Sequence, residues 1–305
     1  MTLSGFVCVH KEPVRKARSR IPRGSQYRKL MALGKKYTPL VSLDLFKGIQ
    51  AFKKRVSRQA LYDVWKKKHF QDIMHTIPWD KLPEDIAPAT DNLHKSMFEA
   101  GAFTIGALPP PVETSLRWDM TNPSIQRYIN TTSANLVKNV EESTRDTIRD
   151  AVVRSFNQVL TPRQIANQLH GSIGLFPRWE KAVENYRAGL MSKGTLSEER
   201  VEDMADAYRE RLLRARARMI ARTETRRATN HGQLSVWREA HARGLISGKA
   251  RRVWMVDGNP CDICEPMDGE ETGLYDSWVL PDGSSCEAAG DAHPNCWCTE
   301  SIELD

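Results

Sequence analysis

The chain has 305 residues, of which 40% are hydrophobic and 27% are charged, and its formal net charge at pH 7 is +7. This length suits roughly two domains, and the composition is that of a globular protein with room for an irregular arm. No stretch approaches the ~18 uninterrupted apolar residues of a membrane span, and the first twenty residues lack the apolar segment of a secretion signal.

Positive charge is concentrated in the first quarter of the chain. Residues 1–70 contain 18 lysines and arginines against three acids, a balance of +15, whereas the remainder sums to −8. A basic segment joined to an acidic body is typical of proteins that contact a polyanion or an acidic protein surface. A solvated arm without a specific partner is the alternative.

The N-terminal third divides into two predicted regions. Residues 1–42 are rich in Lys, Arg, Pro and Gly, so we expect an arm that is disordered or ordered only by a partner. Residues 43–120 form a basic helical region that ends near the three prolines of ALPPPVET, which break a helix. In its first helix, apolar positions recur at helical spacing. They are Leu45, Phe52, Val56, Leu61 and Trp65.

Basic side chains lie between these apolar positions. We take them as candidates for binding a polyanion or an acidic partner surface. They are Lys53, Lys54, Arg55, Lys66, Lys67 and Lys68.

Residues 121–244 are predicted to form a helical body. A stripe of apolar and threonine side chains runs from Leu136 to Val159. Thr161 with Pro162 and Gln164 has the residues of a capped helix start. After a further helix over residues 178–192, a long helix opens at Ser197, and Asn230-His231-Gly232 is a candidate break in it.

The stripe along this long helix changes from apolar to polar. Its apolar part is Met204, Tyr208, Leu212, Ala215 and Met219, and its continuation is Thr223, Arg226, Asn230 and Gln233. Either the helix becomes exposed there, or the polar side chains form a buried network that docks the helix onto the C-terminal strands. The leading members of such a network are Arg222, Glu224 and Asn230.

Residues 245–305 have the character of a small β-rich unit. KARRVWMVDG, WVLPDG and CTESIEL are short, β-branched or aromatic, and bounded by turn residues, so they predict strands. The predicted fold class is therefore α+β and predominantly α: a helical body with a long helix, followed by a small β-rich unit that contains Cys and His.

Five of the six cysteines lie in this unit, where two pairs have metal-ligand spacing. Cys261 and Cys264 are spaced so that one turn presents both sulfurs to a tetrahedral zinc ion, and His293 with Cys296 offers a second pair. Cys298 is a further candidate ligand. A structural zinc ion is the predicted cofactor. Reduced thiols packed in a small core are the alternative, followed by a disulfide, which the missing secretion signal disfavours.

Catalytic motifs are missing from the sequence. It has no HExxH, glycine-rich phosphate loop or GxSxG, and no carboxylate pair in a recognisable frame. We therefore predict that the protein is not an enzyme. The alternatives are a toxin-like nuclease, tested by hydrolysis of nucleic acid, and a zinc-dependent DNA-binding protein, which the acidic cysteine unit disfavours.

Four motifs follow one another in the C-terminal half: ARTETRRATNHGQ, VWMVDGNPCDIC, MDGE and HPNCWC. In this order they resemble the phage Mu F-protein-like head morphogenesis family, over about residues 125–305. Trp297 stands where relatives often have arginine. The matching positions are Arg222, Glu224, Asn230, Trp254, Cys261, Cys264, His293, Cys296 and Cys298.

The resemblance implies a structural minor head protein of tailed bacteriophages. It implies a place in the virion head near the portal vertex, in a few copies around the portal, after assembly in the host cytoplasm. The implied partners are the portal protein and the major capsid protein, with packaged double-stranded DNA as a further candidate and no membrane.

Overall fold

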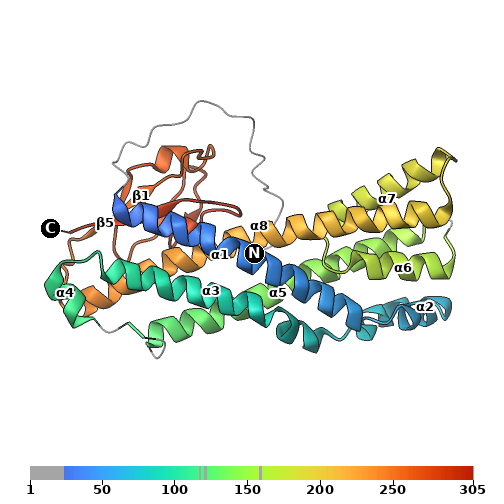
Figure 1. The fold of residues 1–305 in the computed structure, drawn as a ribbon, viewed down its shortest axis with the longest axis horizontal. Helices are drawn as coiled ribbons and strands as arrows, with labels where there is room; N and C mark the ends of the chain where they lie inside the picture. The colour runs from blue at the N-terminus through green and yellow to red at the C-terminus, as the bar shows by residue number, and fades with distance from the viewer. Residues whose placement is uncertain (1–23, 117, 120–121, 158–159, 305) are drawn as a thin grey trace. The chain divides into compact units, whose positions relative to one another are not determined.

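The structure is a computed structural model and describes residues 24–116, 118–119, 122–157 and 160–304 (Figure 1). It is mainly helical, with a few short antiparallel strands near the C-terminal end, so the predicted α+β class is confirmed. None of the described helices combines the length and the apolar character that a membrane span requires.

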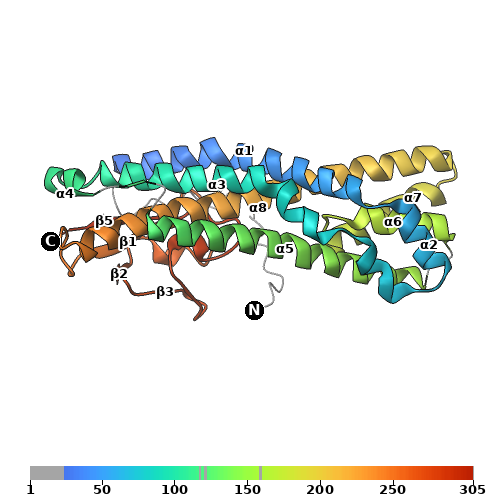
Figure 2. The same ribbon diagram turned by 90° about the horizontal axis from the view of Figure 1, so that it is seen from below.

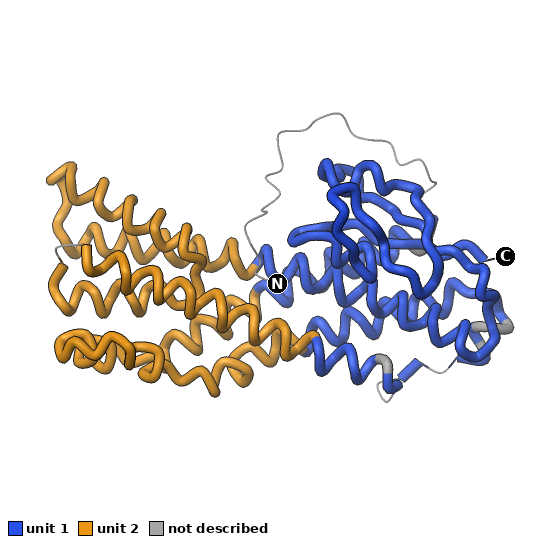
Figure 3. Tube along the Cα trace, turned by 180° about the vertical axis from the view of Figure 1, so that it is seen from behind, with its two compact units in different colours: residues 1–42, 91–131, 218–305 blue, residues 43–90, 132–217 orange. Residues whose placement is uncertain are grey.

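The chain forms two compact units, each assembled from segments that are separated in the sequence (Figure 3). The first, which we call the sheet unit, contains the described residues up to 42 together with 91–131 and 218–305. The second, the helical unit, contains residues 43–90 and 132–217. This division differs from the linear one predicted from the sequence, because several long helices contribute residues to both units.

Helices supply most of both units, and the ends of several were predictable. Thr161 accepts a hydrogen bond from the Gln164 amide and completes a capping box, as its sequence predicted. Gly194 has a φ of +65° just after the helix that ends at Ser192. The bounds are α1 (Ser25–Arg55), α2 (Arg58–Lys66), η1 (Phe70–Thr76), η2 (Trp79–Lys81), α3 (Leu82–Ile105), α4 (Pro110–Ser115), α5 (Pro123–Ser155), α6 (Pro162–Ser172), α7 (Pro177–Ser192) and α8 (Glu198–Ala242).

The N-terminal segment is more ordered than its composition predicted. Helix α1 begins at Ser25, so the described part of residues 1–42 is helical, and the prediction of an irregular arm is wrong there. The reason is an apolar stripe that the many lysines and arginines obscure. Leu30, Leu33, Tyr37 and Val41 are buried within the chain itself. Residues 1–23 lie outside the described residues.

Helices α1 and α3 run side by side (Figures 1 and 2). In the sheet unit, Lys36 pairs with Glu99 at 2.7 Å, and in the helical unit Gly48 lies against the backbone of Asp85. Helix α3 ends at Ile105 before the prolines, as predicted, but Pro110 then begins the short helix α4. Proline is tolerated there because the first helical turn leaves its amides without helical partners.

The long helix α8 does not break at the predicted position. Gly232 lies against the backbone of Met97 on α3, where a Cβ atom would collide with the carbonyl oxygen. The glycine therefore allows two helices of the sheet unit to approach closely and does not end the helix.

The sheet unit is built around strand β1 (Arg251–Met255). It pairs antiparallel with β2 (Glu271–Gly273) and β5 (Thr299–Glu303), in the order β2–β1–β5. A second pair joins β3 (Trp278–Val279) to β4 (Ser285–Cys286), and the 3-10 turns η3 (Glu265–Met267) and η4 (Ala289–Asp291) lie between strands. The three segments predicted as strands each contain one. The ring centroids of Trp254 and Trp278 lie 5.2 Å apart, edge to face, in a core that also contains Cys264, Cys296 and Cys298.

The helical unit has a core of residues from α1, α5 and α8. The stripe predicted on α8 has the right spacing but is shifted by one residue. Met204 and Leu212 are half-buried and Ala215 is exposed. The buried apolar positions are Val201, Ala205, Leu213 and Ala217. Sequence periodicity missed this face because it also holds two buried arginines, Arg209 and Arg216.

Candidate metal centre and its polar surroundings

A tight turn brings Cys261 and Cys264 to the same side of one loop. This loop follows β1, and the amides of Cys264 and Glu265 both donate to the carbonyl oxygen of Cys261, at 3.0 and 2.9 Å. Helix η3 continues the turn. This is the arrangement expected when two cysteines are separated by two residues, because both sulfurs can then point toward one metal ion.

The hexapeptide HPNCWC forms the facing turn. The amide of Cys296 donates to the His293 carbonyl at 3.3 Å, and Asn295 adopts a φ of +68°, a conformation that Asn tolerates better than most residues. The His293 ring donates from Nδ1 to the Pro294 carbonyl at 2.9 Å, which turns Nε2 toward the sulfurs. A ring nitrogen held by a backbone carbonyl is the usual outer contact of a metal-binding histidine.

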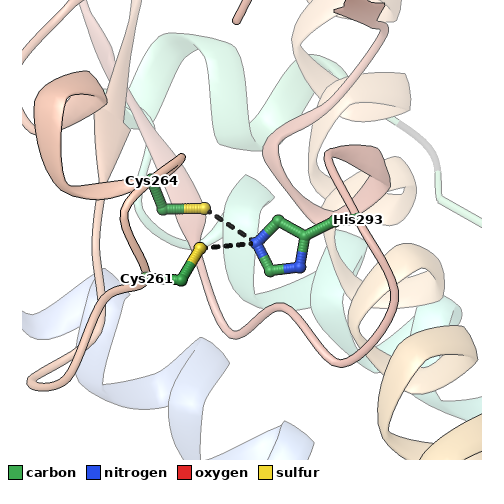
Figure 4. A group of neighbouring side chains, drawn as sticks. All are labelled: Cys261, Cys264 and His293. Carbon is green, nitrogen blue, oxygen red and sulfur yellow. Dashed lines mark hydrogen bonds between the residues drawn. The ribbon is translucent and has the colours of Figure 1, made fainter. Parts of the chain in front are cut away.

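The two turns bring the predicted ligands together. Figure 4 shows His293 Nε2 facing the sulfurs of Cys261 and Cys264, each 3.1 Å away. Cys264 Sγ is also 3.8 Å from Cys296 Sγ. Zinc–sulfur bonds of ~2.3 Å give a tetrahedron with edges of about 3.8 Å, so the thiol pair already has the separation of two zinc ligands.

Cys264 is common to two groups of potential ligands. One is Cys261, Cys264 and His293, and the other is Cys264, Cys296 and Cys298, with the ligand atoms of each group within 4.8 Å of one another. The described cysteines are free, so no disulfide joins them. The Cys298 amide donates to Cys296 Sγ at 3.4 Å, a contact that stabilises a thiolate.

The cluster favours the thiolate at two of its cysteines and the thiol at the other two. Hydrogen bonds with Cys261, Cys296 and Cys298 raise the pKa of Cys264. The contact with Cys264 lowers the pKa of Cys298, but the hydrogen bond with Cys296 and burial raise it above the ordinary value. The hydrogen bonds of Cys261 with Cys264 and then with His293 lower the pKa of Cys261 to about 3. The hydrogen bond with Cys264 likewise lowers the pKa of Cys296. In contrast, burial raises the pKa of Cys286, which is outside both groups, to about 12. Since the thiolate is the form that binds metal, Cys261 and Cys296 have the chemistry of metal ligands.

Protonation of His293 points the same way. Burial lowers the pKa of His293, but the hydrogen bonds of its ring with Cys261 and Cys296 outweigh burial and raise this pKa to about 11. A proton on Nε2 thus sits among the sulfurs and neutralises part of their charge. A metal ion would displace this proton on binding.

Trp297 of the same turn lies against two arginines of α8. The Arg222 and Arg226 guanidinium carbons are 4.9 and 4.8 Å from its ring centroid. Gly34 of α1 makes room for the ring, because a Cβ atom there would come within 2.9 Å of it. Trp297 therefore ties the hexapeptide to both α1 and α8.

Arg226 is buried without a carboxylate partner among the described residues. Its contacts are the Leu30 carbonyl oxygen at 3.5 Å and the Met31 sulfur at 3.0 Å, and its Nε has no hydrogen-bond partner in the described part of the chain. Burial lowers the pKa of Arg226 to about 10, and the groups that oppose this most are the thiols of Cys296 and Cys298.

The polar face of α8 is buried, so the alternative of an exposed helix end does not hold. Asn230 donates to the Cys298 carbonyl at 3.3 Å, and Gln233 donates to that of Glu300 at 2.8 Å. The Thr223 hydroxyl accepts from the Asn295 amide at 2.8 Å. The face therefore docks onto the turn that contains the candidate ligands.

The other two predicted members of this network lie at its edges. Arg222 is half-buried against Trp297. Glu224 is buried and pairs with Arg227 at 3.1 Å, and Arg227 lies 3.5 Å from Asp291, which is hydrogen-bonded to His231 at 2.8 Å.

One buried ion pair was not predicted. Arg252 on β1 is fully buried and meets Glu300 on β5 at 3.1 Å. Glu300 also accepts from the Trp278 indole at 2.9 Å and from the Ala289 amide at 2.6 Å. The pair lies on the two strands that flank the cluster loops. No local pattern marks it, because the partners are 48 residues apart.

The basic residues predicted to bind a polyanion have different surroundings, and their binding role stays a prediction. In the helical unit, burial, followed by the charge of Arg209, lowers the pKa of Lys53 to about 8. Arg55 pairs with Asp85 at 2.8 Å. Lys54, Lys66, Lys67 and Lys68 are exposed. The predicted apolar positions Leu45, Phe52 and Val56 belong to the core and not to a docking face.

A long helix docks by a polar face onto a small sheet, and a Cys/His cluster lies at the contact between them. The family model described as "Phage Mu protein F like protein" matches residues 146–301, half of the chain. The chain belongs to this family of phage head morphogenesis proteins, and the resemblance read from its motifs is confirmed. Comparison with curated proteins and with solved structures found no match.

Proposed function

We propose that the protein is a structural minor head protein that assembles with portal or capsid subunits, and that a zinc ion staples its sheet unit. Family membership supports the first part. The observation that carries the second is the convergence of Cys261, Cys264, His293 and Cys296 from two loops. These four residues would hold the metal, and Cys298 is the alternative fourth ligand.

The sheet unit has strands too short to bury much apolar surface, so a metal ion that links its loops would add stability. Its strands are two to five residues long, and strands so short bury little apolar surface. Structural zinc contributes its binding free energy directly to folding, because the unfolded chain has no preformed site. The zinc would therefore fix the loops that receive the polar face of α8.

The unpaired arginine agrees with an anionic centre. Zinc bound by three thiolates and one neutral histidine carries a single net negative charge. That charge would lie near the Arg226 guanidinium. Burial lowers the pKa of Arg226 to about 10, and the Cys296 and Cys298 thiols partly oppose this shift. A buried cation without a counter-charge costs several kcal/mol, so a metal–thiolate centre would offset a cost that the protein otherwise carries.

The role in the head is tested by protein analysis of purified virions. We expect the chain in mature heads in few copies, and a deletion of its gene should give defective heads. Particles of normal composition and infectivity that lack the chain would contradict the role.

A further inference from the structure

An aromatic cluster lies at the surface of the helical unit. Trp65 at the end of α2, Phe70 at the start of η1 and Phe156 just after α5 meet with ring centroids 4.7, 5.4 and 4.8 Å apart. Phe156 is 57% exposed, and Val153, one turn earlier on α5, is 63% exposed. Apolar side chains gathered at a surface from distant segments are typical of an interaction site.

A run of lysines follows Trp65 directly. Lys66, Lys67 and Lys68 are exposed, and Lys67 and Lys68 form no ion pair with any residue that the structure describes. Nearby acids are engaged: Asp63 accepts from Gln59 at 2.9 Å and Asp72 lies 3.7 Å from His69. Lys67 and Lys68 are therefore available to an outside carboxylate, although the charged side chains of Asp63 and Asp72 lie within five residues of them in the sequence.

The backbone holds this run in a fixed position. Lys68 has a φ of +59°, and the His69 amide donates to the Val64 carbonyl at 3.1 Å. This is the geometry that ends many helices, with a left-handed residue that is usually glycine. A lysine in that conformation is strained, and the turn returns the chain so that Phe70 reaches Trp65.

We propose that this surface docks an acidic segment of another head protein, with apolar side chains of the segment against Phe156 and Val153 and its carboxylates near Lys67 and Lys68. The inference rests on the proposed assembly role for the source of the segment. Rigid aromatic anchors with a charged rim are the usual composition of a protein-binding hot spot.

Nucleic acid fits the surface less well. Single strands stack bases on free ring faces, but here the three rings pack against one another at interplanar angles of 36°, 59° and 85°. The exposed Val153 side chain offers nothing to a phosphate. A second copy of the chain is also disfavoured, because a two-fold contact over this face would bring two lysine runs together.

Point variants test the surface without disturbing the core. We would compare the amount of chain in purified particles for Val153→Ser/Phe156→Ser and for Lys67→Glu/Lys68→Glu. The matched control is Tyr186→Ser/Met191→Ser, two exposed apolar residues of α7 in the same unit. We expect each test pair to reduce incorporation by about tenfold or more, and the control to incorporate as wild type. Wild-type incorporation of both test pairs would overturn the inference.

Photo-crosslinking identifies the partner and does not depend on how the variants fold. With p-benzoyl-phenylalanine in place of Phe156, illumination of particles should attach the chain to a head-protein peptide with a net negative charge. A crosslink to DNA, to another copy of the chain, or to no molecule would overturn the inference. Absence of the wild-type chain from particles would instead refute the proposed function, so the two failures are distinguishable.

Discussion

Each unit buries one arginine that has no carboxylate partner among the described residues, but the two arginines are satisfied differently. In the helical unit, Arg216 donates to the Leu175 carbonyl at 3.2 Å and to the Ser143 hydroxyl, and it lies 4.4 Å from the Phe176 ring centroid. In the sheet unit, Arg226 has a single carbonyl contact at 3.5 Å and a thioether contact, and it lies 4.8 Å from the Trp297 ring centroid. Its strongest opposite charges are thiols.

The difference indicates which unit is complete on its own. In the helical unit two oxygen atoms accept from the terminal nitrogens of Arg216, although its Nε, like that of Arg226, has no partner among the described residues. The core of this unit is built from long helices. The sheet unit has short strands, and its buried cation, Arg226, has the Cys296 and Cys298 thiols as its strongest nearby sources of opposite charge. We infer that the helical unit folds without a cofactor, whereas the sheet unit depends on the metal.

The largest expected effect is that of losing the shared ligand. Cys264→Ser should abolish zinc binding and unfold the cluster loops, because structural zinc contributes on the order of 10 kcal/mol to small modules. Hydrogen exchange should show lost protection around residues 253–256 and 296–302. Protection in the helical unit, over residues 140–151 and 201–217, should persist.

The matched control for this change is Cys286→Ser. Cys286 is buried beside the same core but belongs to neither ligand group. A hydroxyl there should cost about 1–3 kcal/mol and leave the zinc in place. Equal effects of the two serine variants would show that the cysteines only fill the core.

Breaking the buried ion pair should have the next largest effect. Arg252→Met leaves Glu300 buried without its partner and should cost about 3–5 kcal/mol. Arg243→Met removes a pair with Glu239 whose arginine side chain is 45% exposed, so it should cost at most about 1 kcal/mol. Urea unfolding followed by tryptophan fluorescence measures both. If the costs are the same, the buried pair does not stabilise the sheet unit.

A smaller effect distinguishes the two unpaired arginines. Arg226→Met should weaken zinc affinity about 10–100-fold, the range for groups just outside the ligands. Arg216→Met, the equivalent change in the helical unit, should leave the affinity unchanged. Competition with a chromophoric chelator measures both. If both variants bind zinc as wild type does, the Arg226 charge is not coupled to the centre.

The smallest effect is an opposite pH dependence in the two units. In the sheet unit, burial lowers the pKa of His231, but the hydrogen bond and charge of Asp291 outweigh it and raise the pKa above 6.5. This stabilisation is complete below pH 6.5 and is lost as the pH rises through the raised pKa. In the helical unit, burial and then the Lys53 charge lower the pKa of His170 to about 4. Stability there is greatest above pH 6.5 and falls as the pH drops toward 4.

Unfolding free energies of His231→Gln and His170→Gln between pH 4 and 8 check these signs. Relative to wild type, His231→Gln should remove stability mainly at the acidic end. His170→Gln should flatten the decline toward low pH. Parallel curves for both variants would show that neither histidine is coupled to its surroundings as the structure indicates.

Local signals predicted much of the fold and part of the site. The Thr161–Gln164 capping box, the strand at 251–255 and the Cys261–Cys264 turn are each encoded within a few residues, so their patterns could be recognised. Long-range pairings left no such pattern. Arg252 with Glu300, and Phe156 with Trp65, meet only after the chain has folded. Helix α1 was missed at its start because a basic composition outweighed four correctly spaced apolar residues.

A truncation cannot test whether the basic N-terminal region binds a partner. A truncation that begins at Thr121 would remove α1 and α3, whose buried side chains belong to the cores of both units. If the truncated chain were missing from particles, the cause would be unfolding of both cores and not the loss of a contact with a partner. Point variants of exposed residues separate these two causes.

The metal content of the purified chain shows whether zinc holds the two cluster loops together. Zinc is measured after exhaustive dialysis, together with the reactivity of the thiols. We predict one zinc ion per chain, with Cys261, Cys264 and Cys296 protected from thiol reagents until a strong chelator removes the metal. A folded chain that retains no zinc and whose cluster thiols react freely would contradict the account.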